Sequence, residues 1–251
     1  MAGGNEDPDP RPAVLILAPM RIELQPLVRV LRLRRVEAAG SPGRRIYRGT
    51  AGKLRLVATT AGIGTAASAA AAREMLDAEP FDRVVVCGVA GGIGPGTPVG
   101  SVIVPQAVRD TDGNEYRAHP LAGAHLDGTV LTVTDLVTDQ GALARLAGQG
   151  VRALDMETAA VAAVCEERGH PWSAVRSISD RADEGTLDDD LVGLLSRDGS
   201  IAPARVLRYL APRPWRAAAA GRLYRDFALA ARAAAAVTAD ACTRLGRDGA
   251  P

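Results

Sequence analysis

The sequence predicts an α/β protein, a single three-layer domain with a central mixed β-sheet flanked by helices, plus C-terminal helices. Short apolar runs, typical of strands buried on both faces, alternate with segments of helical spacing from residue 13 to about residue 180. The chain has 251 residues, of which 47% are apolar and 24% charged, so it can bury a large core. We expect a disordered tail over residues 1–12, the main domain over 13–200 and a helical, arginine- and alanine-rich extension over 201–251.

The first part of the chain predicts a strand, a helix, a hairpin and a second helix. The hairpin has Ala51 and Gly52 in its turn. Glu23 belongs to the first turn of the first helix, where the helix dipole favours a carboxylate. The expected ranges are 13–18 for the first strand, 22–31 for the helix, 45–49 and 54–60 for the hairpin, and 65–76 for the second helix.

The second part predicts further strands, separated by one long polar segment and two helices. Residues 105–127 read as an irregular excursion, and its length suggests a lid or specificity loop. The expected strands are 84–87, 99–104 and 129–133, with a helix over 141–147. Residues 151–183 are expected to form a strand, a helix and a strand, with Glu157 just past the first strand and Asp180 just past the second.

The C-terminal region differs in composition, being mainly alanine, leucine and arginine. We expect two helices, roughly 203–211 and 215–245. These helices pack on the sheet with a solvated basic face, or alternatively present a basic amphipathic surface to a membrane or a greasy substrate.

Composition excludes several classes of function. The net charge is +1, which indicates no general attraction to nucleic acid. Three cysteines lie far apart, so neither a disulfide framework nor a cysteine zinc site is indicated, and a reducing cytoplasm fits best. The first residues lack the apolar core of a signal peptide, and there is no run of about 18 apolar residues. His119 and His125 have no ligand-like neighbours, so we expect no metal site.

Two glycine-rich segments follow strands. Residues 62–67 match the G-x-G-x-x-A dinucleotide fingerprint, but Asp82, at the right distance, precedes its strand instead of ending one. We therefore expect no cofactor. Gly88 to Gly94 could bind an anion through its backbone N–H groups or be a tight turn that sterically requires glycine. We interpret it as a turn that lets a ligand lie close to the main chain.

Glu157 and Asp180 are the strongest candidates for chemistry. Each follows a strand, and in a βαβ crossover the two strands are parallel, so both carboxylates are expected at one edge of the sheet. Singly, each acid has a local explanation at a helix terminus. Together with Met156 and Ser179 they predict acid/base work on a small molecule in the crevice at the strand ends.

These segments resemble a known family. Leu154–Ala160 (LDMETAA) and Val175–Asp183 (VRSISDRAD) resemble signature segments of the purine nucleoside phosphorylase superfamily, nearest the 5'-methylthioadenosine/S-adenosylhomocysteine nucleosidases. Gly88–Gly92 with the following strand, and Ala18–Glu23, resemble other segments of that family. Residues 192–200 and the tail are similar to the hopanoid-associated branch, whose members remove adenine from adenosylhopane.

The resemblance implies a role for each matching residue. Asp180 would be the general acid that protonates N7 of the departing purine, with Ser179 holding it. Glu157 would bind the ribose hydroxyls and balance the oxocarbenium charge, Met156 would pack against the sugar, and Glu23 would activate water. This chemistry is coherent, because a leaving base needs a proton, a cationic sugar a negative neighbour, and water an acceptor.

Other matched positions bear on binding and on the nucleophile. Val137 and Thr138 match positions that bind the purine in the family, and Gly91 and Val89 lie on the glycine-rich segment, Val89 replacing a serine frequent in nucleosidases. Phosphorylase relatives supply an arginine and a serine there, where this chain has Val86 and Val89. Arg21 and Arg48 remain as candidate hydrogen-bond donors to a bound phosphate.

The sequence therefore favours hydrolysis of a 5'-modified adenosine-type nucleoside, with phosphorolysis as the alternative and a non-catalytic nucleoside-binding module as a lower one. The resemblance further implies a cytoplasmic homo-oligomer, most simply a dimer. The 5' substituent cannot be inferred from these residues.

Overall fold

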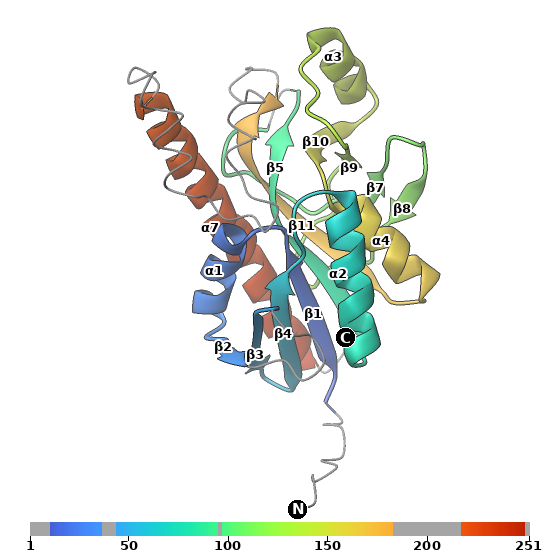
Figure 1. Cartoon of the computed structure of the whole chain (residues 1–251), viewed down its shortest axis with the longest axis vertical. Helices are drawn as coiled ribbons and strands as arrows, with labels where there is room; N and C mark the ends of the chain where they lie inside the picture. The colour runs from blue at the N-terminus through green and yellow to red at the C-terminus, as the bar shows by residue number, and fades with distance from the viewer. Residues whose placement is uncertain (1–10, 37–43, 95–96, 183–216, 249–251) are drawn as a thin grey trace, which may run out of the picture.

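The computed structural model describes residues 11–36, 44–94, 97–182 and 217–248, and these form one mixed eleven-stranded sheet with helices on both faces (Figure 1). The strands are β1 (Ala13–Ala18), β2 (Arg34–Val36), β3 (Ile46–Ala51), β4 (Leu54–Thr60), β5 (Arg83–Gly92), β6 (Val102–Ile103), β7 (Ala107–Arg109), β8 (Glu115–Arg117), β9 (Thr129–Thr132), β10 (Val151–Asp155) and β11 (Trp172–Arg181). The helices are α1 (Arg21–Val30), α2 (Thr65–Ala78), α3 (Gln140–Gly148), α4 (Thr158–Glu167) and α7 (Ala217–Asp248).

Alternate residues of the central strands face two different helical layers. Leu15 and Val84 belong to the apolar cluster that includes residues of α2 and α4. Ile16 and Val85 belong to the cluster that includes residues of α1 and α7. Because successive strand residues point to opposite faces, these apolar runs bury both faces of the sheet. The predicted three-layer α/β fold is confirmed.

The long helix α7 crosses one face of the sheet beside α1 (Figure 1). Its buried side chains recur at helical spacing and are mostly alanines, including Ala234, Ala235 and Ala241. At its far end, the Gly246 carbonyl accepts a hydrogen bond from the Lys53 N–H in the β3–β4 turn, at 3.1 Å. This helix corresponds to the second predicted C-terminal helix. The expected helix over 203–211 and nearly all of the expected disordered tail lie outside the described residues.

The predicted parallel crossover around α4 is wrong. β11 runs parallel to β5 along its length, whereas β10 runs antiparallel to β5 and pairs only at Gly91 and Gly92. β11 occupies one edge of β5, so β10 must lie on the other edge. The chain therefore passes from one side of β5 to the other through α4, and Glu157 and Asp180 do not reach the site as the ends of parallel neighbours.

Other elements differ in extent. β5 continues to Gly92, so Gly88 to Gly92 are strand residues and not a turn. Pairing with β11 on one edge supplies the hydrogen bonds that allow glycines to stay extended there. The excursion 105–127 contains the antiparallel pair β7 and β8, while the strand expected over 99–104 shortens to β6. No described helix has the length and apolarity needed to cross a bilayer.

Candidate active site

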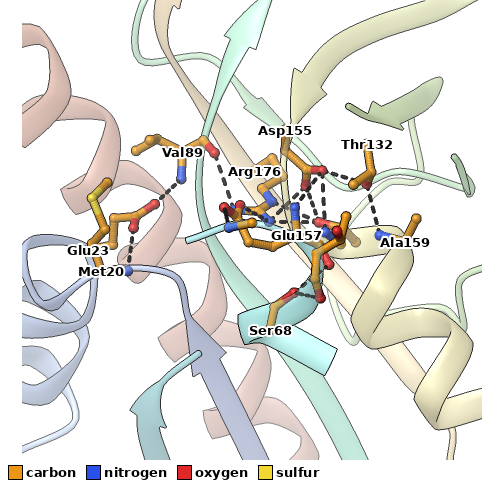
Figure 2. A network of polar contacts seen from close by, with 12 residues as sticks. Met20, Glu23, Ser68, Val89, Thr132, Asp155, Glu157, Ala159 and Arg176 are labelled. Carbon is orange, nitrogen blue, oxygen red and sulfur yellow. Dashed lines mark hydrogen bonds and ion pairs between the residues drawn. The ribbon is translucent and has the colours of Figure 1, made fainter. Parts of the chain in front are cut away.

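Glu23 lies in the first turn of α1, directly after the carboxyl end of β1. Its carboxyl group accepts hydrogen bonds from the backbone N–H groups of Met20 and Val89, each at 2.8 Å (Figure 2). Burial raises the pKa of Glu23 to about 8, although Arg176 and the two N–H donors lower it, and nearby Glu157 adds to the rise. The helix dipole alone does not explain a carboxyl group that is 1% exposed and connected to a different strand.

Glu157 follows β10 and precedes the first residue of α4. Its Oε1 accepts a hydrogen bond from the Gly64 N–H at 3.0 Å, at the start of α2. Its Oε2 lies 3.4 Å from Nη2 of Arg176. Burial raises the pKa of Glu157, and Arg176 opposes that rise. Gly64 belongs to the segment that matches the dinucleotide fingerprint, and its N–H binds a carboxylate of the protein itself.

Arg176, a residue of β11, links the carboxyl groups of the site and is not among the residues that the sequence predicts for it. Its side chain is fully buried, and Nη2 lies 2.7 Å from Oδ2 of Asp155. Nη1 donates to the Val89 carbonyl at 3.3 Å, so the peptide unit at Val89 connects Arg176 to Glu23 (Figure 2). The available signal was an arginine inside an apolar strand, because buried arginines are nearly always paired.

Gly88 explains why the glycine-rich segment approaches this network so closely. A Cβ atom at Gly88 would lie 2.5 Å from Nη1 of Arg176 and 2.6 Å from Oε1 of Glu23. Any side chain there would displace one of the two charged groups. The predicted turn is a strand here, and its glycine leaves room for two charged side chains of the protein; that a ligand lies close to this main chain stays a prediction.

Asp180 lies further along the same pair of strands. Arg176 is paired with Gly88 and Asp180 with Gly91, so the two positions are about 10 Å apart at the strand rise. Ser179 occupies a register irregularity, and its hydroxyl donates to Oδ1 of Asp180 at 2.5 Å. Burial raises the pKa of Asp180, while the Ser179 hydrogen bond lowers it. The predicted pairing of Ser179 with Asp180 is therefore present as a direct contact.

The remaining predicted site residues fall into a half-buried pair and an exposed pair. Met156 and Val137 are half-buried and pack against the same small apolar cluster, which includes Ile93 and Leu154. Thr138 and Arg21 are exposed, and within the described part of the chain no recorded contact joins either to the carboxyl groups of the site.

Arg48, one of the two candidate hydrogen-bond donors to phosphate, forms an ion pair with Glu79, at 2.5 Å. The Val86 side chain is buried in the core, whereas Val89 takes part in the network through its backbone atoms.

Comparisons with known proteins identify the family of this chain. A family model described as the phosphorylase superfamily matches residues 13–127 and 117–211. A 5'-methylthioadenosine/S-adenosylhomocysteine nucleosidase from an Exiguobacterium species is 31% identical over 169 residues, which cover 55% of this chain and 72% of the relative. The futalosine hydrolase of Streptomyces coelicolor is 30% identical over 181 residues, covering 57% of this chain and 77% of the relative.

The fold is also found in solved structures. The Neisseria meningitidis 5'-methylthioadenosine/S-adenosylhomocysteine nucleosidase, solved with methylthio-immucillin-A, superposes with a TM-score of 0.68 at 20% identity, covering 92% of this chain and 98% of that one. The mixed sheet between helical layers is thus the fold of nucleosidases and nucleoside phosphorylases. The chain belongs to the phosphorylase superfamily and is an enzyme of the nucleosidase or nucleoside phosphorylase class.

Proposed function

We propose that the enzyme hydrolyses the N-glycosidic bond of a 5'-modified adenosine-type nucleoside and releases adenine. The observation that carries this proposal is the placement of Glu23 and Asp180 against two glycines of the same strand, Gly88 and Gly91. Glu157 joins Glu23 through Arg176 and the peptide unit at Val89. Buried carboxyl groups distributed along one strand can act on the two sides of a single bond.

Each carboxyl group has a chemical task in this proposal. Asp180 donates a proton to N7 of the purine as the bond to the sugar breaks, and burial, which raises its pKa, favours the protonated form. Glu157 accepts hydrogen bonds from the ribose hydroxyls and balances the positive charge that develops on the sugar. Glu23, in its ionised form, accepts a proton from the attacking water.

The charge balance of the network favours water over phosphate as the nucleophile. Phosphate is a dianion that calls for an uncommitted guanidinium or several donors near the anomeric carbon. In the described network, the charge of Arg176 is already balanced by Asp155 and Glu157. The Gly64 N–H at the start of α2 is likewise occupied by Glu157.

The test is to follow adenine release from 5'-methylthioadenosine with and without phosphate. Hydrolysis predicts equal rates in both conditions and a free 5-methylthioribose product. A strict requirement for phosphate, with formation of a sugar 1-phosphate, would establish the alternative phosphorylase reaction. Binding of nucleosides without any release of base would instead support the non-catalytic binding module.

The 5' substituent is tested by a screen of nucleosides. Relatives of this chain carry the names 5'-methylthioadenosine/S-adenosylhomocysteine nucleosidase and futalosine hydrolase, so these three nucleosides form the first set. The resemblance to the hopanoid-associated branch adds an adenosine with a long apolar 5' group. A preference for that compound would also support the proposal that the C-terminal helices contact a membrane or a greasy substrate. An oligomeric state, proposed as a dimer, is measured by sedimentation.

A further inference from the structure

Thr158, the first residue of α4, lies between the two charged groups that hold Glu157 in place. Its hydroxyl donates to Oδ2 of Asp155 and accepts hydrogen bonds from Nε and Nη2 of Arg176, at 3.0 and 2.8 Å. A hydroxyl has one proton and two lone pairs, so these contacts use its full capacity. The residue is fully buried, and water cannot replace the hydroxyl at low cost.

The hydroxyl of Thr158 affects its two partners, Asp155 and Arg176, in different ways. Toward Asp155, the hydroxyl adds to a carboxylate that also accepts the Glu157 and Thr158 N–H groups, each at 3.3 Å, at the start of α4. Toward Arg176, it fixes the Nε edge of the planar guanidinium, which leaves Nη2 directed to Asp155 and Glu157. Without the hydroxyl, the described contacts of Nε would be lost.

We propose that Thr158 is a positioning residue, whose hydroxyl orients the Arg176 guanidinium so that it holds the Glu157 carboxylate against the sugar. This inference rests on the proposed function, because it assigns Glu157 to the ribose. Thr158 does not contact the reacting atoms. It acts through Arg176, and the same guanidinium reaches the Val89 carbonyl beside Glu23.

A pair of substitutions isolates this role. Thr158→Val has nearly the same shape but no hydroxyl, whereas Thr158→Ser keeps the hydroxyl. The matched control is Thr132→Val. Thr132 is also buried and donates to Oδ1 of the same Asp155 at 2.6 Å. It accepts the Ala159 N–H at 2.9 Å, but in the described structure it makes no contact with Arg176.

Steady-state kinetics with 5'-methylthioadenosine should separate the variants. Thr158→Val should lower kcat about 10- to 100-fold, with KM changed less than about threefold, because misplacing Glu157 removes stabilisation of charge formed in the transition state. Thr158→Ser should restore kcat to within about threefold of wild type. Thr132→Val should lower the unfolding temperature like Thr158→Val but keep kcat within about threefold.

The rates are normalised to folded protein, measured by circular dichroism below the unfolding transition of each variant. Equal loss of kcat in Thr132→Val and Thr158→Val would overturn the inference, because general support of Asp155 would then explain both. A kcat of Thr158→Val near wild type, failure of serine to rescue, or a change confined to KM would also overturn it. Absence of base release by the wild-type protein would refute the proposed function itself, and the inference with it.

Discussion

At the scale of single residues, charge is the dominant feature of the site. Three buried carboxyl groups, those of Glu23, Asp155 and Glu157, surround the single guanidinium of Arg176 in the described network. One positive charge cannot balance three negative charges in a region of low dielectric constant, so proton uptake relieves the excess. Burial is the main cause of the raised pKa values of Glu23 and Glu157, and a neighbouring carboxylate, Glu157 for Glu23 and Asp155 for Glu157, adds to each rise. Arg176 stays charged, because the three carboxyl groups raise its pKa against the effect of burial.

The Glu23 carboxyl group should make the protein less stable as the pH rises. Its pKa is about 8 in the folded protein and 4.5 for an unperturbed glutamate, so between these values the folded state holds a proton that the unfolded state has released. The free energy of unfolding should therefore fall with rising pH across this window, by at most about 1.4 kcal/mol per pH unit. Urea unfolding from pH 5 to pH 8.5 measures the slope.

In Glu23→Gln this slope should be smaller, whatever the absolute stability of the variant, because glutamine does not titrate. The comparison protein is Glu167→Gln, which removes an exposed carboxylate from α4 and should leave the slope as in the wild type. Identical slopes in wild type and Glu23→Gln would show that Glu23 does not titrate in this window.

Asp180 offers a direct test of the general-acid role. Asp180→Asn removes the proton donor while keeping the size of the side chain. Turnover should therefore fall by about 10²- to 10⁴-fold, and nucleoside binding should be largely retained. Adenine release and equilibrium dialysis measure the two quantities. Asp112→Asn, at an exposed position between β7 and β8, is the control. Near-normal turnover of Asp180→Asn would refute the assignment.

At the scale of elements, β5 organises the site because glycine lets other groups approach its backbone. Gly88 lies beside Glu23 and Arg176, and Gly91 lies 3.6 Å, measured from an added Cβ, from Oδ2 of Asp180. Extended pairing with β11 keeps this stretch in the sheet although glycine weakens strands. The strand therefore combines a rigid position with space for ionisable side chains.

Gly88→Ala should damage both stability and activity. The new Cβ must move either Arg176 or Glu23, which should destabilise the fold by about 1–3 kcal/mol and lower kcat/KM by about 10²-fold. Urea unfolding and adenine release provide the two measurements. Gly221→Ala in α7 is the matched control, because an added Cβ meets nothing within 4 Å there, and helix propensity predicts a small gain in stability. A fully active Gly88→Ala would contradict the described packing.

At the scale of the whole molecule, α7 ties the end of the chain to the edge of the sheet. Alanines on one side of the helix allow it to lie close to β5 and β11, where Ala234 and Ala235 join the core with Val85 and Val175. Its last turns reach the β3–β4 hairpin, at the end of the sheet opposite to Glu23, since Ala13 pairs with Arg55 and Ala18 with Thr60. Helix and sheet are therefore stabilised together.

Gly246→Ala should separate stability from catalysis. A Cβ atom at Gly246 would overlap the Ala51 carbonyl oxygen, and backbone atoms cannot move aside as a flexible side chain would. We expect a loss of about 1–3 kcal/mol in the free energy of unfolding, with kcat/KM within about threefold of wild type at temperatures where the variant is folded. Thermal unfolding and adenine release measure the two effects. Loss of activity without loss of stability would show that the far end of α7 is coupled to the site.

Much of the fold could be predicted from local patterns, whereas the pairing of strands could not. Apolar runs such as Ala13–Ala18 identified buried strands, because a strand covered on both faces needs apolar residues at every position. The sequence predicts the wrong direction for β10, because a helix of ten residues can lead to either edge of β5 and the residues of α4 do not specify which. The sequence predicts a turn at Gly88–Gly92, because the strand that pairs with this segment lies about ninety residues later in the chain.

By itself, the sequence determined the alternation of strands and helices, the positions of Glu23, Glu157 and Asp180 near strand ends, and the resemblance to the phosphorylase superfamily. Only the tertiary structure decided that Arg176 joins the carboxyl groups, that burial raises the pKa of Glu23, and that Arg48 lies in a separate ion pair. Hydrophobic periodicity is a local property, because it depends only on residues that are close in sequence. A pKa or an ion pair depends on which distant groups share a buried volume, and that is set when β5, β10, β11 and α1 come together.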